Sequence, residues 1–265
     1  MKRVAIAMPV HCAPKIAQMT LGTWLDSCDG SYQAKVFISV HQNYSHYHPG
    51  LPELQAMPVT ILGVPEMNWA IADTGQSIQR YSTMHCHCLS ALFSMIGRED
   101  FDYVIVLDHD LVFKTDFVKA AIDTGTDLIG GYLADRKESV IQNTAVGLLA
   151  FAPKFTVWHL AMSKAFFERL SVDCGLIYPT IKDGFFYDSF SRVVLKNKTE
   201  WNMPVTEWSS ERMAEMVDHR WSMSFNFGQV IYGVHSYWDR LAKYEAEYDA
   251  RFPNGITHLF GRVGL

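Results

Sequence analysis

Short apolar runs alternate with helix-like patterns through the first half of the chain. The runs are rich in β-branched residues, which predicts buried strands; they are Val4–Met8, Val36–Val40 and Tyr103–Leu107. Between the last two runs, apolar residues recur at helical spacing until Gly97 ends the pattern; they are Ile78, Tyr81, His85, Leu89, Leu92 and Ile96. Strand–helix–strand alternation predicts an α/β fold with a mainly parallel central sheet and helices on both faces.

The second half of the chain has a less regular pattern. Thr115 or Asp116 can cap a helix that runs through Ala121, and Ser163 can cap a short helix with inward apolar residues. Those inward residues are Phe166, Phe167 and Leu170. Further strands are predicted at Leu128–Leu133, Ala145–Phe151, Thr156–Met162 and Gln229–Val234.

The stretch Cys174–Asp188 is rich in glycine and aromatic residues and is predicted to be a loop. A helix near Ser189–Leu195 follows it, and a charged helical stretch lies beyond Trp238. Because the chain has no internal repeat, low-complexity segment or linker, we expect one domain over residues 1–265.

Composition narrows the class of protein. With 49% hydrophobic residues, the chain can bury a sizeable core. Its net charge of -5 and its lack of a basic run argue against a protein that holds duplex DNA through phosphate contacts. It has no apolar run long enough for a membrane span, and the short run after Lys2 and Arg3 does not fit a secretory signal. Five irregularly spaced cysteines predict free thiols, so we expect a cytoplasmic protein.

The strongest chemical feature is an acidic pair, Asp108 and Asp110, directly after the third apolar run. Carboxylates two residues apart on an extended chain point to the same side, so both can approach one ion or ligand. Ligands of parallel sheets bind beyond the carboxyl ends of strands, and carboxylates suit Mn²⁺ or Mg²⁺ that also binds substrate phosphates. The alternative is a structural turn in which the two aspartates cap the following segment.

The strand that ends in Asp108-His109-Asp110 resembles the metal-dependent GT-A fold glycosyltransferases, in which an Asp-x-Asp motif follows such a strand. The resemblance implies a single Rossmann-like domain that transfers a sugar from a nucleotide diphosphate-sugar, with a UDP-sugar as the favoured donor. It implies a nucleotide-sugar-binding half over residues 1–112, an acceptor-binding half over 113–240 and a C-terminal helix and tail over 241–265. Asp108 and Asp110 would then bind the metal and the donor diphosphate.

Other donor-side residues follow from the same resemblance. Pro9, Val10 and His11 match the end of the family's first strand, where the nucleotide base rests. Arg80 falls where a donor-contacting helix begins, so it could reach the diphosphate or be a solvated helix residue. His41 begins a polar loop after the second strand, where contact with base or ribose is one reading and a surface loop the other.

On the acceptor side, Asp188 stands in a segment similar to the family's acidic segment that opens a helix. The resemblance implies that Asp188 deprotonates the acceptor hydroxyl, with Asp183 in reserve; an N-cap for the helix from Ser189 is the structural alternative. His235, after the last predicted strand, matches a third metal ligand of the family, and His219 is a weaker competitor. Imidazole suits Mn²⁺ better than Mg²⁺.

The run His85-Cys86-His87-Cys88 suggests a zinc site, but its place on the predicted helix argues against one. Residues two apart on a helix point to nearly opposite sides, so Cys86 and Cys88 cannot grip one ion. Both are predicted to be buried or half-buried thiols.

Two further functions remain open from the sequence. The strand ending in Asp108-His109-Asp110 also fits loosely a phosphatase resembling the haloacid dehalogenase family, with Asp108 as nucleophile. A non-catalytic sugar- or nucleotide-binding module would keep the acidic pair without a positioned base. For a glycosyltransferase, the acceptor could be a glycan, another hydroxyl-bearing polymer or a modified nucleic acid.

Overall fold

The structure is a computed structural model that describes residues 1–10, 14–41, 51–65, 77–131, 140–143, 147–151, 160–182, 185–187, 189–219 and 245–264. Its strands are β1 (Lys2–Val10), β2 (Tyr32–His41), β3 (Thr60–Val64), β4 (Tyr103–Val106), β5 (Leu111–Phe113), β6 (Leu128–Gly131), β7 (Val140–Asn143), β8 (Gly147–Phe151), β9 (Leu160–Ser163), β10 (Thr180–Lys182), β11 (Phe185–Tyr187), β12 (Val205–Trp208) and β13 (Val217–His219). Its helices are α1 (Pro14–Ser27), α2 (Leu51–Gln55), α4 (Ser77–Ile96), α5 (Phe117–Asp123), α6 (Lys164–Ser171), α7 (Ser191–Lys196) and α8 (Ser210–Met216), with the short turns η2 (Cys174–Ile177), η3 (Asn197–Trp201) and η5 (Thr257–Val263). None of these described helices is both long and apolar enough to span a membrane.

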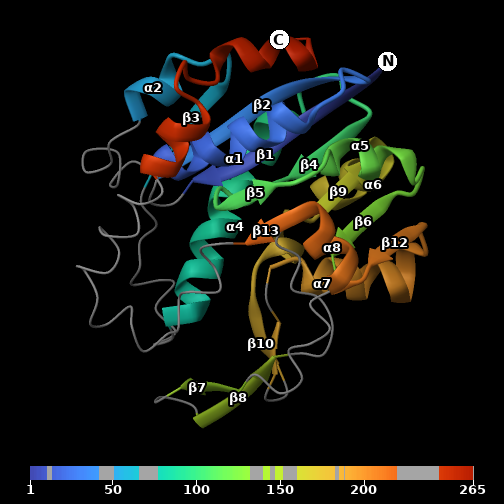
Figure 1. The fold of residues 1–265 in the computed structure, drawn as a ribbon. Coiled ribbons are helices and arrows are strands. Elements are labelled where there is room, and N and C mark those ends of the chain that lie inside the picture. The colour runs from blue at the N-terminus through green and yellow to red at the C-terminus, as the bar shows by residue number, and fades with distance from the viewer. Residues whose placement is uncertain are drawn as a thin grey trace.

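A seven-stranded sheet in the order β12-β6-β9-β4-β1-β2-β3 forms the centre of the molecule (Figure 1). β9 is antiparallel to both of its neighbours, and every other neighbouring pair is parallel. The three apolar runs of the first half form, in chain order, the strands β1, β2 and β4. The helix predicted between the second and third runs is α4. The predicted α/β fold with a mainly parallel sheet is therefore confirmed.

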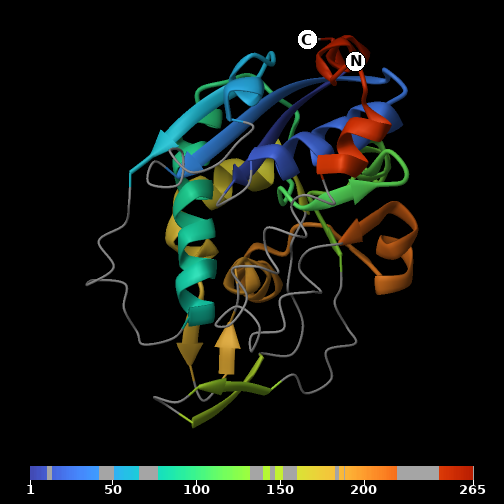
Figure 2. The ribbon, with the colours of Figure 1, turned by 60° about the vertical axis from the view of Figure 1, so that its left-hand side comes forward.

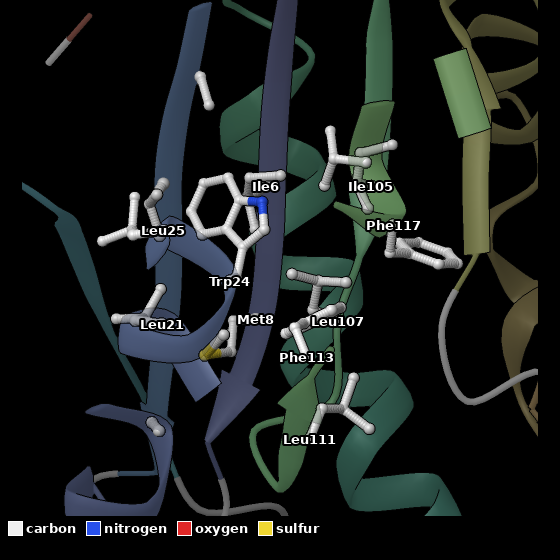
Figure 3. Packing of buried hydrophobic residues seen from close by; sticks show 14 of the residues in the cluster. Ile6, Met8, Leu21, Trp24, Leu25, Ile105, Leu107, Leu111, Phe113 and Phe117 are labelled. Atoms are coloured by element: carbon white, nitrogen blue, oxygen red, sulfur yellow. The ribbon is translucent and has the colours of Figure 1, made fainter. Parts of the chain in front are cut away.

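Helices cover both faces of this sheet, because successive side chains of a strand point to opposite faces. On β1, Ile6 and Met8 join one core with α1, α5 and the C-terminal segment, residues 245–264. Ala5 and Ala7 of the same strand join a second core with α4, α6 and α7. Figure 2 shows α4 along its face of the sheet, and Figure 3 shows Trp24 of α1 packed beside Ile6 in the first core.

Two helix caps were correctly predicted. The Asp116 carboxylate accepts a hydrogen bond from the Lys119 N–H at 2.9 Å, and the Ser163 hydroxyl accepts one from the Phe166 N–H at 3.2 Å. The inward residues of α6 are buried as expected. The charged stretch beyond Trp238 is helical over residues 245–251, whereas the predicted strand Gln229–Val234 lies outside the described residues.

The prediction of a loop over Cys174–Asp188 was wrong. The segment contains the antiparallel pair β10 and β11, which belongs to a four-stranded sheet in the order β10-β11-β8-β7 at the lower end of both views (Figures 1 and 2). β11 also pairs in parallel with β8. That pairing is remote along the chain, so composition alone could not reveal it.

Other boundaries also differ from the prediction. The helix predicted from Ser189 begins at Ser191, because Phe190 has a φ of 63° and a left-handed conformation that cannot continue a helix. Phe190 therefore occupies the N-cap position of α7, whereas Asp188 lies outside the described residues. The strand predicted over Thr156–Met162 is described only from Leu160, as β9.

Candidate functional site

The strand order of the central sheet reverses between β1 and β4. The chain runs from β1 to β2 and β3 on one side, whereas β4 lies on the other side of β1. In open sheets of this kind, the crevice outside the carboxyl ends at such a reversal is where ligands bind. Val10 ends β1 at this edge, and the Leu107 N–H donates to the Ala7 carbonyl at 3.0 Å where β4 ends beside it.

Asp108 and Asp110 lie at this reversal point, in the turn that joins β4 to β5. Figure 3 shows Leu107 and Leu111, the buried residues on either side of this turn. The Asp108 side chain is 14% exposed, and Asp110 is half-buried. Both carboxylates thus belong to the rim of the sheet rather than to its core.

A hydroxyl of α1 holds the same turn. The buried Thr20 hydroxyl donates to the His109 carbonyl at 2.6 Å and accepts a hydrogen bond from the Leu111 N–H at 3.0 Å. One turn further along α1, the buried Thr23 hydroxyl accepts a hydrogen bond from the Phe113 N–H at 3.0 Å. Helix α1 therefore binds both the acidic turn and β5.

Two imidazoles flank the acidic pair from inside the protein. His85 Nδ1 lies 3.5 Å from Asp108 Oδ1. Burial, reinforced by nearby His109, lowers the pKa of His85 to about 3, so this contact joins a neutral imidazole to the carboxylate and is not an ion pair. Burial also lowers the pKa of His109, against the opposing effects of Asp110 and the Pro9 backbone.

Neighbouring residues of α4 join the acidic turn to the segment that precedes α7. His85 contacts Asp108, while the thiol of Cys86 donates to the Ile177 carbonyl at 3.0 Å and lies 3.2 Å from the Ser189 hydroxyl. Ser189 directly follows Asp188 in the chain. One turn of one helix thus touches two regions that the sequence had singled out for separate reasons.

The acidic pair suits a hard divalent cation that also binds substrate. Mg²⁺ and Mn²⁺ prefer oxygen ligands, and proteins commonly hold Mg²⁺ by one or two carboxylates plus phosphates and water. Within the described part of the chain, no group of three or more His, Cys, Asp or Glu residues could hold a metal by itself. Asp108 and Asp110 therefore fit a cation whose remaining ligands come from a phosphorylated ligand and solvent.

The structure brings together Pro9, Val10 and the acidic pair at one edge of the sheet. His41 ends β2 at this edge, and Arg80 lies in the first turn of α4, but only their backbones are described. His11, Asp183, Asp188 and His235 lie outside the described residues.

His219 has a place near the acidic pair. Its strand β13 pairs with β5, so that the His219 backbone lies opposite Leu111, the residue that follows Asp110. Because β5 and β13 lie more than a hundred residues apart in the chain, no local pattern indicated that this histidine would come close to Asp110.

Sequence reasoning missed Thr20 and His85, which contact the acidic turn, and Thr23, which binds β5. The two threonines are fully buried, and they are polar positions on the apolar face that α1 presents with Leu21 and Trp24. That pattern was a usable signal that α1 binds backbone groups of another segment. Nothing in the sequence indicated that His85 would meet Asp108. Cys86 and Cys88 are fully buried thiols, as predicted.

No family model matches the chain, and no curated protein matches its sequence. Solved structures with a similar fold include the following two. One is the 4-diphosphocytidyl-2C-methyl-D-erythritol synthase of Anaerococcus prevotii, with 9% identity and a TM-score of 0.43 over 78% of this chain and 89% of that chain. The other is a Desulfovibrio desulfuricans protein described as a candidate nucleotide-diphospho-sugar transferase, with 14% identity and a TM-score of 0.45 over 99% of both chains. Likeness at this level carries no argument about the chemistry of this chain, which rests on the site itself.

Proposed function

We propose that the protein is a metal-dependent glycosyltransferase that moves a sugar from a nucleotide diphosphate-sugar, with UDP as the favoured nucleotide, to an acceptor hydroxyl. The observation that carries the proposal is the position of Asp108 and Asp110 at the reversal of strand order between β1 and β4. A crevice at such a point suits a nucleotide, and a carboxylate pair there suits its diphosphate through Mn²⁺ or Mg²⁺.

In this proposal the residues divide into a donor side and an acceptor side. Pro9 and Val10 at the end of β1 support the base, while Asp108 and Asp110 hold the cation and the diphosphate. A divalent cation bound there would act as a Lewis acid. It would stabilise the negative charge that builds on the departing diphosphate by several kcal/mol. Arg80, His41 and His11 are further donor-side candidates.

The acceptor side centres on Asp188, with Asp183 as the alternative general base. Support comes from Cys86 on α4, whose thiol lies 3.2 Å from the hydroxyl of Ser189 while its neighbour His85 contacts Asp108. A base within reach of both the donor and the acceptor could take the acceptor proton as the new glycosidic bond forms. His219 and His235 are candidates for an additional metal ligand.

The test is a panel of nucleotide-sugars incubated with the protein and Mn²⁺, with release of free nucleoside diphosphate as the readout. We expect slow donor hydrolysis that a chelator abolishes, because water can replace the unknown acceptor. Asp110→Ala should lose this activity and keep the fold. Asp100→Ala is the matched control, because Asp100 begins a second Asp-x-Asp triplet before β4 and is exposed in an ion pair with Arg3.

Other outcomes would point elsewhere. Full activity of Asp110→Ala, or of the wild type in excess chelator, would refute the metal site. Hydrolysis of phosphomonoesters with a covalent aspartyl-phosphate on Asp108 would favour the phosphatase alternative. Binding of a nucleotide-sugar without any turnover would favour a binding module.

A further inference from the structure

The Thr20 hydroxyl binds the peptide groups on both sides of Asp110. It donates to the carbonyl of His109 at 2.6 Å and accepts from the N–H of Leu111 at 3.0 Å. The carbonyl of Ile16 in its own helix lies at 3.4 Å, so the hydroxyl hydrogen is directed to the turn rather than back along α1. The Thr20 side chain alone therefore holds both ends of the backbone that carries the Asp110 carboxylate.

The position of Thr20 makes this contact a rigid one. Thr20 is fully buried in the interior of α1, and its neighbours Leu21 and Trp24 belong to the core between this helix and the sheet, where Figure 3 shows Trp24 beside Ile6 of β1. A β-branched side chain in a helix also has few rotamers. Since α1 begins at Pro14, shortly after β1 ends at Val10, one helix connects the end of β1 to the acidic turn.

We propose that Thr20 is a positioning residue that sets the Asp110 carboxylate for the divalent cation and the donor diphosphate. This inference rests on the proposed function. Without the hydroxyl, a buried carbonyl and a buried N–H lose their partner, and the turn must shift to satisfy them. Mg²⁺ and Mn²⁺ sites respond to such shifts, because groups that orient a metal ligand typically contribute about 10–100-fold to affinity or activity.

Thr23 provides a matched control. It is equally buried, lies one helical turn further along, and accepts a comparable hydrogen bond from the Phe113 N–H at 3.0 Å. Its partner lies at the far end of β5 rather than beside Asp110. Thr20→Val and Thr23→Val should therefore both reduce thermal stability, while only Thr20→Val should disturb the acidic turn.

The experiment is a titration of each metal-free protein with Mn²⁺ in the presence of UDP, with free Mn²⁺ followed by electron paramagnetic resonance. We expect Thr20→Val to weaken Mn²⁺ binding by about 10–100-fold, and Thr23→Val to change it by less than about threefold, within the usual context-dependence of such effects. Thr20→Ser keeps a hydroxyl and should restore wild-type affinity. If Thr20→Val does not fold, Thr20→Cys, with a weaker donor of similar size, should show a smaller loss in the same direction.

The outcomes separate this inference from the proposed function. Wild-type Mn²⁺ affinity in a folded Thr20→Val or Thr20→Cys protein, alongside a loss in Asp110→Ala, would overturn the role of Thr20 and leave the metal site standing. Equal losses in Thr20→Val and Thr23→Val would show a general structural effect and would also overturn it. No Mn²⁺ binding by the wild type would overturn both proposals.

Discussion

Gly22 of α1 faces Phe252 and Ile256 of the C-terminal segment. Replacing Gly22 with alanine tests how closely α1 packs against that segment. A Cβ atom at this position would stand 2.7 Å from Cε2 and 2.9 Å from Cζ of Phe252, and 2.8 Å from Cγ2 of Ile256. Non-bonded carbon atoms attract best at about 3.5–4.0 Å. The added methyl group therefore overlaps two side chains at once.

Two opposing effects decide the change in stability. Alanine is favoured over glycine inside a helix by about 1 kcal/mol. Overpacking a filled core typically costs about 1–3 kcal/mol. The upper part of that range applies here, because the Phe252 ring is rigid, Ile256 is fully buried and Phe252 is only 8% exposed. We expect Gly22→Ala to lower the free energy of unfolding by about 1–2 kcal/mol, which is a fall in Tm of roughly 2–6 °C.

Thermal and urea denaturation, followed by circular dichroism, measure this change. The control is Gly261→Ala in η5, because a Cβ atom there meets no other atom within 4 Å. Phe252→Leu should relieve the clash, so Gly22→Ala should be less harmful in that background, with a coupling energy above about 0.5 kcal/mol. Limited proteolysis should also cut the C-terminal segment of Gly22→Ala faster than that of the wild type.

A stability of Gly22→Ala equal to or above that of the wild type would refute this reasoning, because helix preference would then outweigh the contact with the C-terminal segment. Strict additivity with Phe252→Leu would show that the ring is not what opposes the methyl group.

Three further predictions follow from the described residues. Burial raises the pKa of Asp116 against the hydrogen bonds that lower it; the fold thus favours the protonated acid, and its stability falls as pH rises from the ordinary carboxyl value through the raised one. Asp116→Asn should remove this slope in denaturation midpoints above about pH 4, and an unchanged slope would contradict the assignment. Burial raises the pKa of the Cys28 thiol to about 12 and that of Cys88 to about 11, so brief alkylation of the native protein should modify the partly exposed Cys174 before Cys28 and Cys88, as peptide mass spectrometry would show. Phe190→Gly relieves a left-handed backbone worth about 1–2 kcal/mol but deletes a buried aromatic ring worth about 3–5 kcal/mol, so chemical denaturation should show a net loss; a stabilised variant would mean that the backbone strain dominates.

Local patterns in the sequence were enough to predict the main elements near the site. β-Branched apolar runs predicted β1, β2 and β4, and helical spacing predicted α4 up to Gly97. Asp116 and Ser163 were recognisable as caps because an N-cap side chain binds the backbone N–H three positions further along the chain, which is a local contact. The acidic pair was also recognisable from local sequence, because Asp108 and Asp110 come directly after a buried strand.

Pairings between remote segments were not predictable from such patterns. β9 lies antiparallel between β4 and β6. β11, which lies in the stretch that composition had predicted to be a loop, pairs with β8. β5 has only three residues, too few for a periodic signal, and its partner β13 lies more than a hundred residues later. The sequence shows that such segments can pair, whereas the choice of partner depends on the packing of the whole sheet.

The sequence by itself determined that an acidic pair stands at the end of a buried parallel strand in an α/β protein, because side-chain alternation and strand composition are local properties. Only the tertiary structure decided what surrounds that pair. Thr20 reaches the carbonyl of His109 across 89 residues of chain, and the neighbouring α4 residues His85 and Cys86 contact Asp108 and Ser189 respectively. These contacts depend on how α1 and α4 pack on opposite faces of the sheet, and that packing is a property of the folded molecule as a whole.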